Sequence, residues 1–221
     1  MNATPTQVRR TDPAKRVLPP RPFVAVLFAA SFTMLLYVIE VVDRILPTNL
    51  QQEGIQARTL SGLDGVLWAP MLHGPWGHVV ANTVPVALFG FLVMSGGIGQ
   101  WIAVTATVWL FSGLGVWLVG PSDAVTIGAS GLAFGWLAFL LVRGIFNRSV
   151  GQLVLAAVLF FVYGGMFWGV LPTVAGNVSW QGHLFGAVAG VLAAWLVARA
   201  DRPTRPPARP AGATLPGNLG A

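Results

Sequence analysis

The sequence predicts an all-α membrane protein with six transmembrane helices and both termini in the cytoplasm. Three observations lead to this prediction. Of the 221 residues, 55% are hydrophobic and 9% are charged, whereas soluble domains average about 25% charged residues. The apolar residues gather in six stretches, most of them near the ~20 residues that cross a bilayer. Most Lys and Arg residues gather in three segments that such a topology places on one side of the membrane.

The six predicted spans follow one another along the chain, with one long loop after the first. They run Pro22 to Val42, His78 to Met94, Ile98 to Val119, Ser130 to Val142, Val150 to Leu171, and Trp180 to Ala198. The fourth has only 13 residues, which cover ~20 Å at 1.5 Å per helical residue. We therefore expect the segment before it, Gly120 to Ser130, to dip into the membrane. Irregular backbone at that depth is tolerated only against protein or a water-filled cavity.

Basic residues orient the predicted spans, because cytoplasmic loops carry an excess of Lys and Arg. Eleven of the thirteen basic residues precede the first span, separate the fourth from the fifth, or follow the sixth. They are Arg9, Arg10, Lys15, Arg16, Arg21, Arg143, Arg148, Arg199, Arg202, Arg205 and Arg209. We expect a multi-pass protein of the cell inner (plasma) membrane. Residues 1–21 form a cytoplasmic tail, 22–199 the membrane domain, and 200–221 a disordered cytoplasmic tail rich in Pro, Ala, Gly and Arg.

Composition excludes several functional classes. The chain has no cysteine, which rules out disulfides and thiolate metal sites. The net charge of +6 comes from residues at the termini and in one short loop, so it fits membrane orientation better than a nucleic-acid groove. We expect the lipid bilayer as a partner, no nucleic acid, and no cofactor.

Polar side chains at membrane depth are costly and tend to mark function. Spans two, four and six run in the same direction, so their first residues share one leaflet. This brings together His78 and Asn82 from span two, Ser130 from span four and His183 from span six. Counting 1.5 Å per residue from the inner ends places these groups at ~20 to ~24 Å, below the surface of a ~30 Å core. We expect a wet hollow with Ser130 at its floor.

Small residues predict close packing of spans four and six. Gly131 and Gly135 are four apart on span four, and Gly182, Gly186 and Gly190 repeat the spacing on span six. Such spacing lets two helix backbones approach closely. Ser130 and His183 each lie next to one of these glycines.

This set of residues suits acyl transfer. A serine needs an adjacent base to become a useful nucleophile, and His183 is the histidine on the span paired with Ser130. The attacked carbonyl needs hydrogen-bond donors, and His78 and Asn82 lie four apart on one helix face. Together with the Ser130 backbone N–H they could form an oxyanion hole. The paired spans carry no acid at this depth, so the sequence favours a Ser–His dyad over a triad.

Other functions compete with this interpretation. His73 and His78 are five residues apart and point ~140° from each other on a continuous helix, unlike the i, i+4 pair of a zinc helix; we expect no metal. A transporter is disfavoured because the short fourth span has no second copy. A non-catalytic protein that binds membrane helices, with the polar groups serving only as interhelical hydrogen bonds, stays open.

At these residues the sequence resembles the rhomboid family of intramembrane serine proteases. Residues 128–131, Gly-Ala-Ser-Gly, match the family's Gly-x-Ser-Gly motif, and residues 182–186, Gly-His-Leu-Phe-Gly, match its Gly/Ala-His-x-x-Gly motif. His73, His78 and Asn82 match its His-x4-His-x3-Asn pattern. The resemblance covers roughly Trp68 to Ala198. The six predicted spans and their orientation also match the six-helix core of bacterial members.

The resemblance implies cleavage of single-span membrane proteins near their outer ends, by Ser130 and His183. It implies that His78, Asn82 and the Ser130 amide stabilise the oxyanion. It also implies that span five and the loop Pro172–Ser179 form a mobile substrate gate. The motif residues that would support the site are His73, Gly128, Gly131, Phe134, Gly182 and Gly186.

The sequence departs from the family pattern at two places. Phe134 stands where well-studied members often have a Tyr that packs on the catalytic histidine, and a Phe ring can still stack there. Trp68 is followed by Ala69, whereas many members have a Trp-Arg pair in the first outer loop. An inactive member normally lacks the serine or the histidine, and this chain has both.

Overall fold

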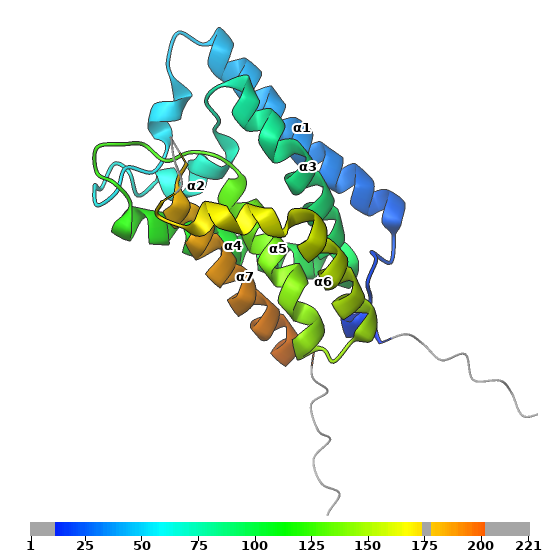
Figure 1. Cartoon of the computed structure of the whole chain (residues 1–221). Helices are drawn as coiled ribbons and strands as arrows, with labels where there is room; N and C mark the ends of the chain where they lie inside the picture. Colours follow the sequence, from blue (N-terminus) through cyan, green and yellow to red (C-terminus); the bar gives the residue numbers. More distant parts are fainter. Residues whose placement is uncertain (1–11, 174–177, 202–221) are drawn as a thin grey trace, which may run out of the picture.

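A computed structural model describes residues 12–173 and 178–201, and their regular structure is helical (Figure 1). An isolated antiparallel bridge between Ile55 and Thr126 is the exception within this part of the chain. Residues 1–11 and residues 202–221 lie outside the described residues, as do residues 174–177 of the predicted gate loop. Of the predicted disordered tail, 200–221, the structure therefore describes only the first two residues, and Ala200 is the last residue of a helix.

Six of the helices are long and apolar. They are α1 (Pro22–Ile45), α3 (Trp76–Val93), α4 (Ile98–Val119), α5 (Ser130–Phe146), α6 (Val150–Tyr163) and α7 (Trp180–Ala200). A four-residue helix, α2 (Gly65–Trp68), lies in the loop after α1, and the 3-10 helices are η1 (Pro13–Lys15), η2 (Leu50–Glu53), η3 (Ala69–Met71), η4 (Met94–Gly96) and η5 (Gly164–Val170). Within residues 12–173 and 178–201, five apolar helical stretches are long enough to cross a membrane, with η4 extending α3 and η5 extending α6. The prediction of an all-α membrane protein is confirmed.

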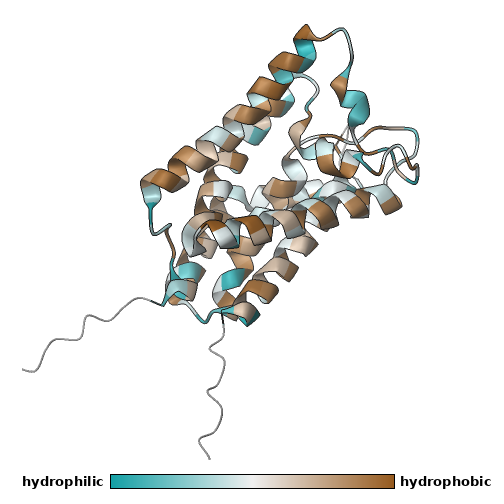
Figure 2. Ribbon diagram, turned by 180° about the vertical axis from the view of Figure 1, so that it is seen from behind, coloured by the Kyte–Doolittle hydropathy of each residue, from teal (hydrophilic) through white to brown (hydrophobic). Residues whose placement is uncertain are grey.

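The surface has the polarity that a lipid environment requires. Figure 2 shows hydrophobic residues along the outward faces of the long helices and hydrophilic residues mainly in the loops at their ends. On α1, for example, Phe23, Leu27 and Met34 are exposed. In water this much contiguous apolar surface would drive association, so the exposed faces identify the helices as lipid-facing.

Helix α5 is the centre of the bundle, and it differs from the expected span. It begins at Ser130 as predicted but continues past Val142 to Phe146, a length of about 25 Å at 1.5 Å per residue. It packs on α3, α4, α6 and α7, and Figure 1 shows it enclosed by these neighbours. Its large side chains Trp136, Phe139 and Leu137 are fully buried.

Arg143 does not lie in a loop, so the expectation that it separates the fourth span from the fifth is wrong. It belongs to α5 and is 3% exposed. Its guanidinium donates to the Ser95 hydroxyl and, at 3.5 Å, to the carbonyl of Arg16. A buried cation persists when polar partners replace its water. The ~20 Å height of Ser130 assumed that the helix ends at Arg143. Because α5 continues to Phe146, that height does not measure the distance from Ser130 to the end of the helix.

Two polar side chains, one from the residue after α5 and one from α6, bind the backbone of the segment before α1. Gln152 donates to the carbonyls of Ala14 and Arg16, both at 2.9 Å, and Asn147 donates to Ala14 at 2.9 Å. Gln152 is 1% exposed, so its amide depends on these carbonyls for its hydrogen bonds. We call this set of contacts the N-terminal clasp.

The loop between α1 and α3 is fixed to the end of α4. The Arg58 side chain donates to the carbonyls of Leu118 and Gly120, at 3.2 and 2.8 Å. The indole N–H groups of Trp117 and Trp109 donate to the carbonyls of Thr59 and Val66, at 2.8 and 2.9 Å. Arginine and tryptophan thus anchor this loop, although neither is part of a Trp-Arg pair at Trp68.

Helices α5 and α7 meet backbone to backbone, as the glycine spacing predicts. A side chain at Gly186 would collide with the carbonyl of Gly131, and one at Gly190 with the carbonyl of Gly135. Val108 of α4 fills the remaining space beside Gly135. The glycines therefore set the separation of the two helices that carry Ser130 and His183.

Replacing Gly190 by Ala tests this contact. The added methyl group would overlap the Gly135 carbonyl, and we expect a loss of about 1–3 kcal/mol of stability from overpacking. Gly99→Ala on α4 is the control, because nothing lies within 4 Å of its added methyl; it should stay within about 1 kcal/mol of wild type. Unfolding in detergent micelles measures both, and equal stabilities would contradict a close α5–α7 contact.

Candidate active site

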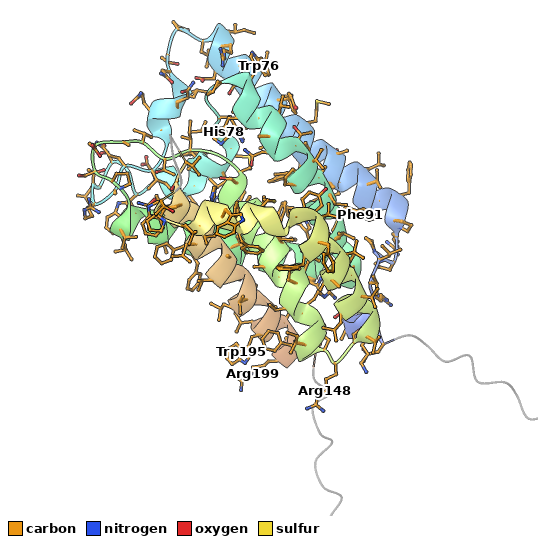
Figure 3. All side chains as sticks on the ribbon, viewed as in Figure 1. Trp76, His78, Phe91, Arg148, Trp195 and Arg199 are labelled. Carbon is orange, nitrogen blue, oxygen red and sulfur yellow. The ribbon has the colours of Figure 1, made fainter. Side chains whose placement is uncertain are left out.

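The helices α3, α5 and α7 begin at one end of the bundle, and a pocket of about 970 Å³ opens there. Ser130 is the first residue of α5, while His78 and His183 lie in the first turns of α3 and α7. In Figure 3, Trp76 and His78 mark this end, and Arg148, Trp195 and Arg199 mark the opposite end. The pocket wall includes all four residues to which the sequence analysis gives a chemical role: His78, Asn82, Ser130 and His183.

Ser130 and His183 are hydrogen-bonded to each other. The Ser130 Oγ lies 2.8 Å from the His183 Nε2, and the His183 Nδ1 lies 2.9 Å from the backbone carbonyl of Gly169 in η5. A carbonyl oxygen can only accept, so the proton of a neutral His183 ring belongs on Nδ1. Nε2 is then the acceptor for the serine hydroxyl, which is the arrangement that a general base needs.

Aromatic rings hold the His183 ring from one side. Phe134, one helical turn after Ser130, stacks on it with ring centroids 4.0 Å apart and planes 8° from parallel. Phe167 of η5 contacts Phe134 edge to face, at 6.1 Å. The expectation that Phe134 can stack on the histidine is confirmed.

His73 and His78 fix the turn that leads into α5. The backbone N–H of Ala129 donates to the His73 Nε2 at 3.3 Å. Burial lowers the pKa of His73 to about 4, so this ring is neutral at pH 7 and can accept that hydrogen bond. Gly128 has a φ of 115°, which only glycine adopts readily, and the His78 ring fills the space where a side chain at 128 would lie.

Asn82 is on the pocket wall, but its amide is bonded within its own helix. The Asn82 Nδ2 donates to the carbonyl of His78 at 2.9 Å, and the residue is buried. Among the described residues, no group of three or more His, Cys, Asp or Glu side chains could hold a metal ion.

The remaining predicted residues lie in the α5–α7 contact. Gly131 faces Ser112 of α4 and the carbonyl of Gly182. The Ser112 hydroxyl also donates to the carbonyl of Gly182, at 2.9 Å. Gly186 packs against Gly131 one turn further along α7. The pocket wall thus contains seven of the ten predicted residues. The other three, His73, Phe134 and Gly186, contact Ala129, His183 and Gly131 respectively.

Two features of the site were missed from the sequence. The Gly169 carbonyl is a backbone group, and no residue pattern announces where it points. Glu40 is a carboxylate inside the first apolar span and is 1% exposed. An acid within an apolar stretch is a readable signal, and it could have been found.

A comparison with family models matches residues 62–200 to the Rhomboid domain. The chain belongs to the rhomboid family. This rhomboid chain is 44% identical to an uncharacterized protein of Mycobacterium tuberculosis over 210 residues, which cover 91% of the chain and 87% of the relative. It is 32% identical to rhomboid-like protein 11, chloroplastic, of Arabidopsis thaliana over 150 residues, 59% of the chain and 51% of the relative.

A Bacillus subtilis protein provisionally named a rhomboid protease is 26% identical over 132 residues, 57% of this rhomboid chain and 63% of the relative. The comparison with solved structures gave no match.

A methyl group at position 169 tests the carbonyl contact to His183. In Gly169→Ala the methyl would lie 3.0 Å from the His183 Nδ1 and 3.1 Å from the Phe134 Cζ, so the ring and η5 must separate by a few tenths of an ångström. We expect the Nδ1–H tautomer of His183 to lose population, as measured by ¹⁵N NMR of histidine-labelled protein. Gly165→Ala in the same 3-10 helix meets nothing within 4 Å and should leave the spectrum unchanged. An unchanged spectrum in Gly169→Ala would refute the role of this carbonyl.

Proposed function

We propose that this rhomboid-family protein is an intramembrane serine endopeptidase that uses Ser130 as nucleophile and His183 as general base. The observation that carries the proposal is the 2.8 Å hydrogen bond between the Ser130 Oγ and the His183 Nε2. The Gly169 carbonyl supports it, because an acceptor on Nδ1 leaves Nε2 able to take a proton.

The chemistry proceeds in two halves. As the Ser130 Oγ bonds to the scissile carbonyl carbon, its proton passes to the His183 Nε2. His183 then gives this proton to the leaving amine nitrogen, the C–N bond breaks, and an acyl-enzyme remains. A water molecule, deprotonated by His183, attacks the ester, and the proton returns to the Ser130 Oγ as the acid product leaves.

The oxyanion is stabilised by donors on three sides. Ser130 heads α5, and backbone N–H groups in the first turn of a helix have no intrahelical acceptor. His78 contributes a ring N–H. The Asn82 amide nitrogen carries two hydrogens; one is bonded to the His78 carbonyl, and the other donates to the oxyanion. Such donors act strongly in a water-poor site because the local dielectric is low.

The substrates are single-span membrane proteins, and they enter from the lipid between helices. Support comes from the loose attachment of α6 and η5. Along α6 only Gln152, Ala156 and Leu159 are buried, and η5 has no buried residue. Trp168 of η5 is 74% exposed. A segment with few buried contacts opens at low cost, so α6 and η5 form the gate.

The membrane is the cell inner membrane. Residues 22–199 form a six-helix domain in it, made of the five spanning stretches and the shorter α5. Residues 1–21 and 200–221 face the cytoplasm, and the pocket faces outward. Arg148 and Arg199 support this orientation, because they lie at the end of the bundle opposite the pocket (Figure 3), where the positive-inside rule requires them.

The catalytic residues are tested by substitution. We expect Ser130→Ala and His183→Ala each to abolish cleavage of a single-span substrate in liposomes, because the first removes the nucleophile and the second its base. Ser130→Ala should also stop labelling by a fluorophosphonate probe. Undiminished cleavage in Ser130→Ala would refute the mechanism. A folded wild type that neither cleaves nor labels would indicate a non-catalytic protein that binds membrane helices.

The oxyanion donors are tested separately. We expect His78→Ala and Asn82→Ala to lower kcat by about 10- to 1000-fold each, as the loss of one donor does in other serine enzymes. Substrate binding should change less, because the donors act on charge that develops in the transition state. Steady-state kinetics measure this, with thermal unfolding as the check on folding. A rise in KM with an unchanged kcat would assign these residues to substrate binding instead.

A further inference from the structure

A buried carboxylate on α1 has one ionic partner in the described part of the chain. Glu40 is 1% exposed. Its Oε1 accepts from the Arg44 Nε at 3.0 Å and from the Arg44 Nη2 at 2.8 Å. Its Oε2 is buried and has no hydrogen-bond partner within that same part. The mechanism proposed above does not use this pair.

Arg44 also reaches across to the start of α3. Its Nη2 donates to the carbonyl of Gly74 at 2.9 Å, and its guanidinium carbon lies 5.7 Å from the centre of the Trp76 ring. Gly74 immediately follows His73 and lies four residues before His78. The guanidinium therefore holds the short turn that separates the two histidines.

Both histidines transmit this position to Ser130. His73 accepts from the N–H of Ala129, and His78 packs against Gly128. These two residues immediately precede Ser130. A displacement of the turn at Gly74 would move both histidine rings, and with them the backbone that presents the nucleophile.

Stability alone does not account for the pair. A buried ion pair loses much of its attraction to desolvation, and replacing both partners by apolar residues is often neutral or stabilising. Arg44 could complete its hydrogen bonds in water, since its side chain is 46% exposed. The buried Glu40 carboxylate cannot, so it draws the guanidinium inward to an orientation in which Nη2 also donates to the Gly74 carbonyl.

We propose that Glu40 and Arg44 are positioning residues for the oxyanion hole: Glu40 orients Arg44, and Arg44 fixes the turn that carries His73 and His78. Neither residue touches the reacting atoms. The inference rests on the proposed protease function, and it makes α1 part of the catalytic framework rather than a membrane anchor alone.

The test uses a double variant, because Arg44→Met alone would leave the Glu40 carboxylate buried without a partner and could prevent folding. Glu40→Leu combined with Arg44→Met removes both charges and the bond to Gly74. Tyr37→Phe is the matched control: it removes another hydrogen bond between α1 and α3, from the Tyr37 hydroxyl to the Thr83 hydroxyl at 2.7 Å, without touching the turn at Gly74. Arg44→Lys keeps a donor for both acceptors, so it should retain part of the wild-type kcat and part of the protection of the turn from exchange.

Hydrogen exchange of residues 72–80 and steady-state kinetics are both measured. In the double variant we expect faster exchange in this peptide and a kcat about 10- to 100-fold lower, the size of effect that a misplaced catalytic group produces. KM should stay within about twofold, and the unfolding temperature close to that of wild type. Tyr37→Phe should match wild type in both measurements.

The proposal is overturned if residues 72–80 exchange as in wild type, or if Tyr37→Phe loses as much kcat as the double variant. It is also overturned if kcat falls only in proportion to a loss of folded protein. Its failure is distinct from that of the protease function. If wild-type protein has no Ser130-dependent cleavage, the hydrogen-exchange result still decides whether the pair fixes the turn.

Discussion

The backbone contact between α5 and α7 is the constraint on which the site depends. A serine side chain is short, so its oxygen can reach a histidine on another helix only if the two backbones lie close together. Ordinary helix pairs keep their axes 8–10 Å apart because of intervening side chains. Here glycines remove those side chains, and carbonyls of α5 lie against Gly186 and Gly190 of α7. The 2.8 Å bond between Ser130 and His183 is a consequence of that separation.

Around this contact, the pocket satisfies its polar groups with partners from several elements. The His183 ring receives an acceptor from η5 and a stacked ring from α5. The Ala129 N–H donates to the His73 ring, and the Ser112 hydroxyl donates to the carbonyl of Gly182. An unpaired polar group costs more in a low-dielectric site than in water. The reactive geometry is therefore maintained by groups that would each lose a hydrogen bond if it changed.

Much of this could be predicted from the sequence, because lipid imposes strong rules on composition. The apolar stretches predict the long helices to within a few residues. The shared direction of spans four and six, together with their glycine spacing, predicts that Ser130 and His183 lie close together. The position of Arg143 could not be predicted in this way, since the rule that places Arg in cytoplasmic loops does not foresee a buried arginine bonded to Ser95. The Gly169 carbonyl could not be predicted at all, because side-chain identity carries no record of where a backbone oxygen points. Glu40 can be recognised in the sequence as an acid in an apolar span, but the bond from its partner Arg44 to the Gly74 carbonyl depends on tertiary contact.

The N-terminal clasp has a consequence for how this region can change over time. Gln152 and Asn147 grip the segment through the carbonyls of Ala14 and Arg16, and every amino acid supplies a carbonyl. The side chains of residues 14 to 16 are left out of the grip, so substitutions there leave these hydrogen bonds in place. Selection for these hydrogen bonds acts on the side chains of Gln152 and Asn147. It does not constrain the side chains of the segment that they bind. Substitutions of Lys15 and Arg16 can thus change the surface charge of this segment without removing the hydrogen bonds that hold it.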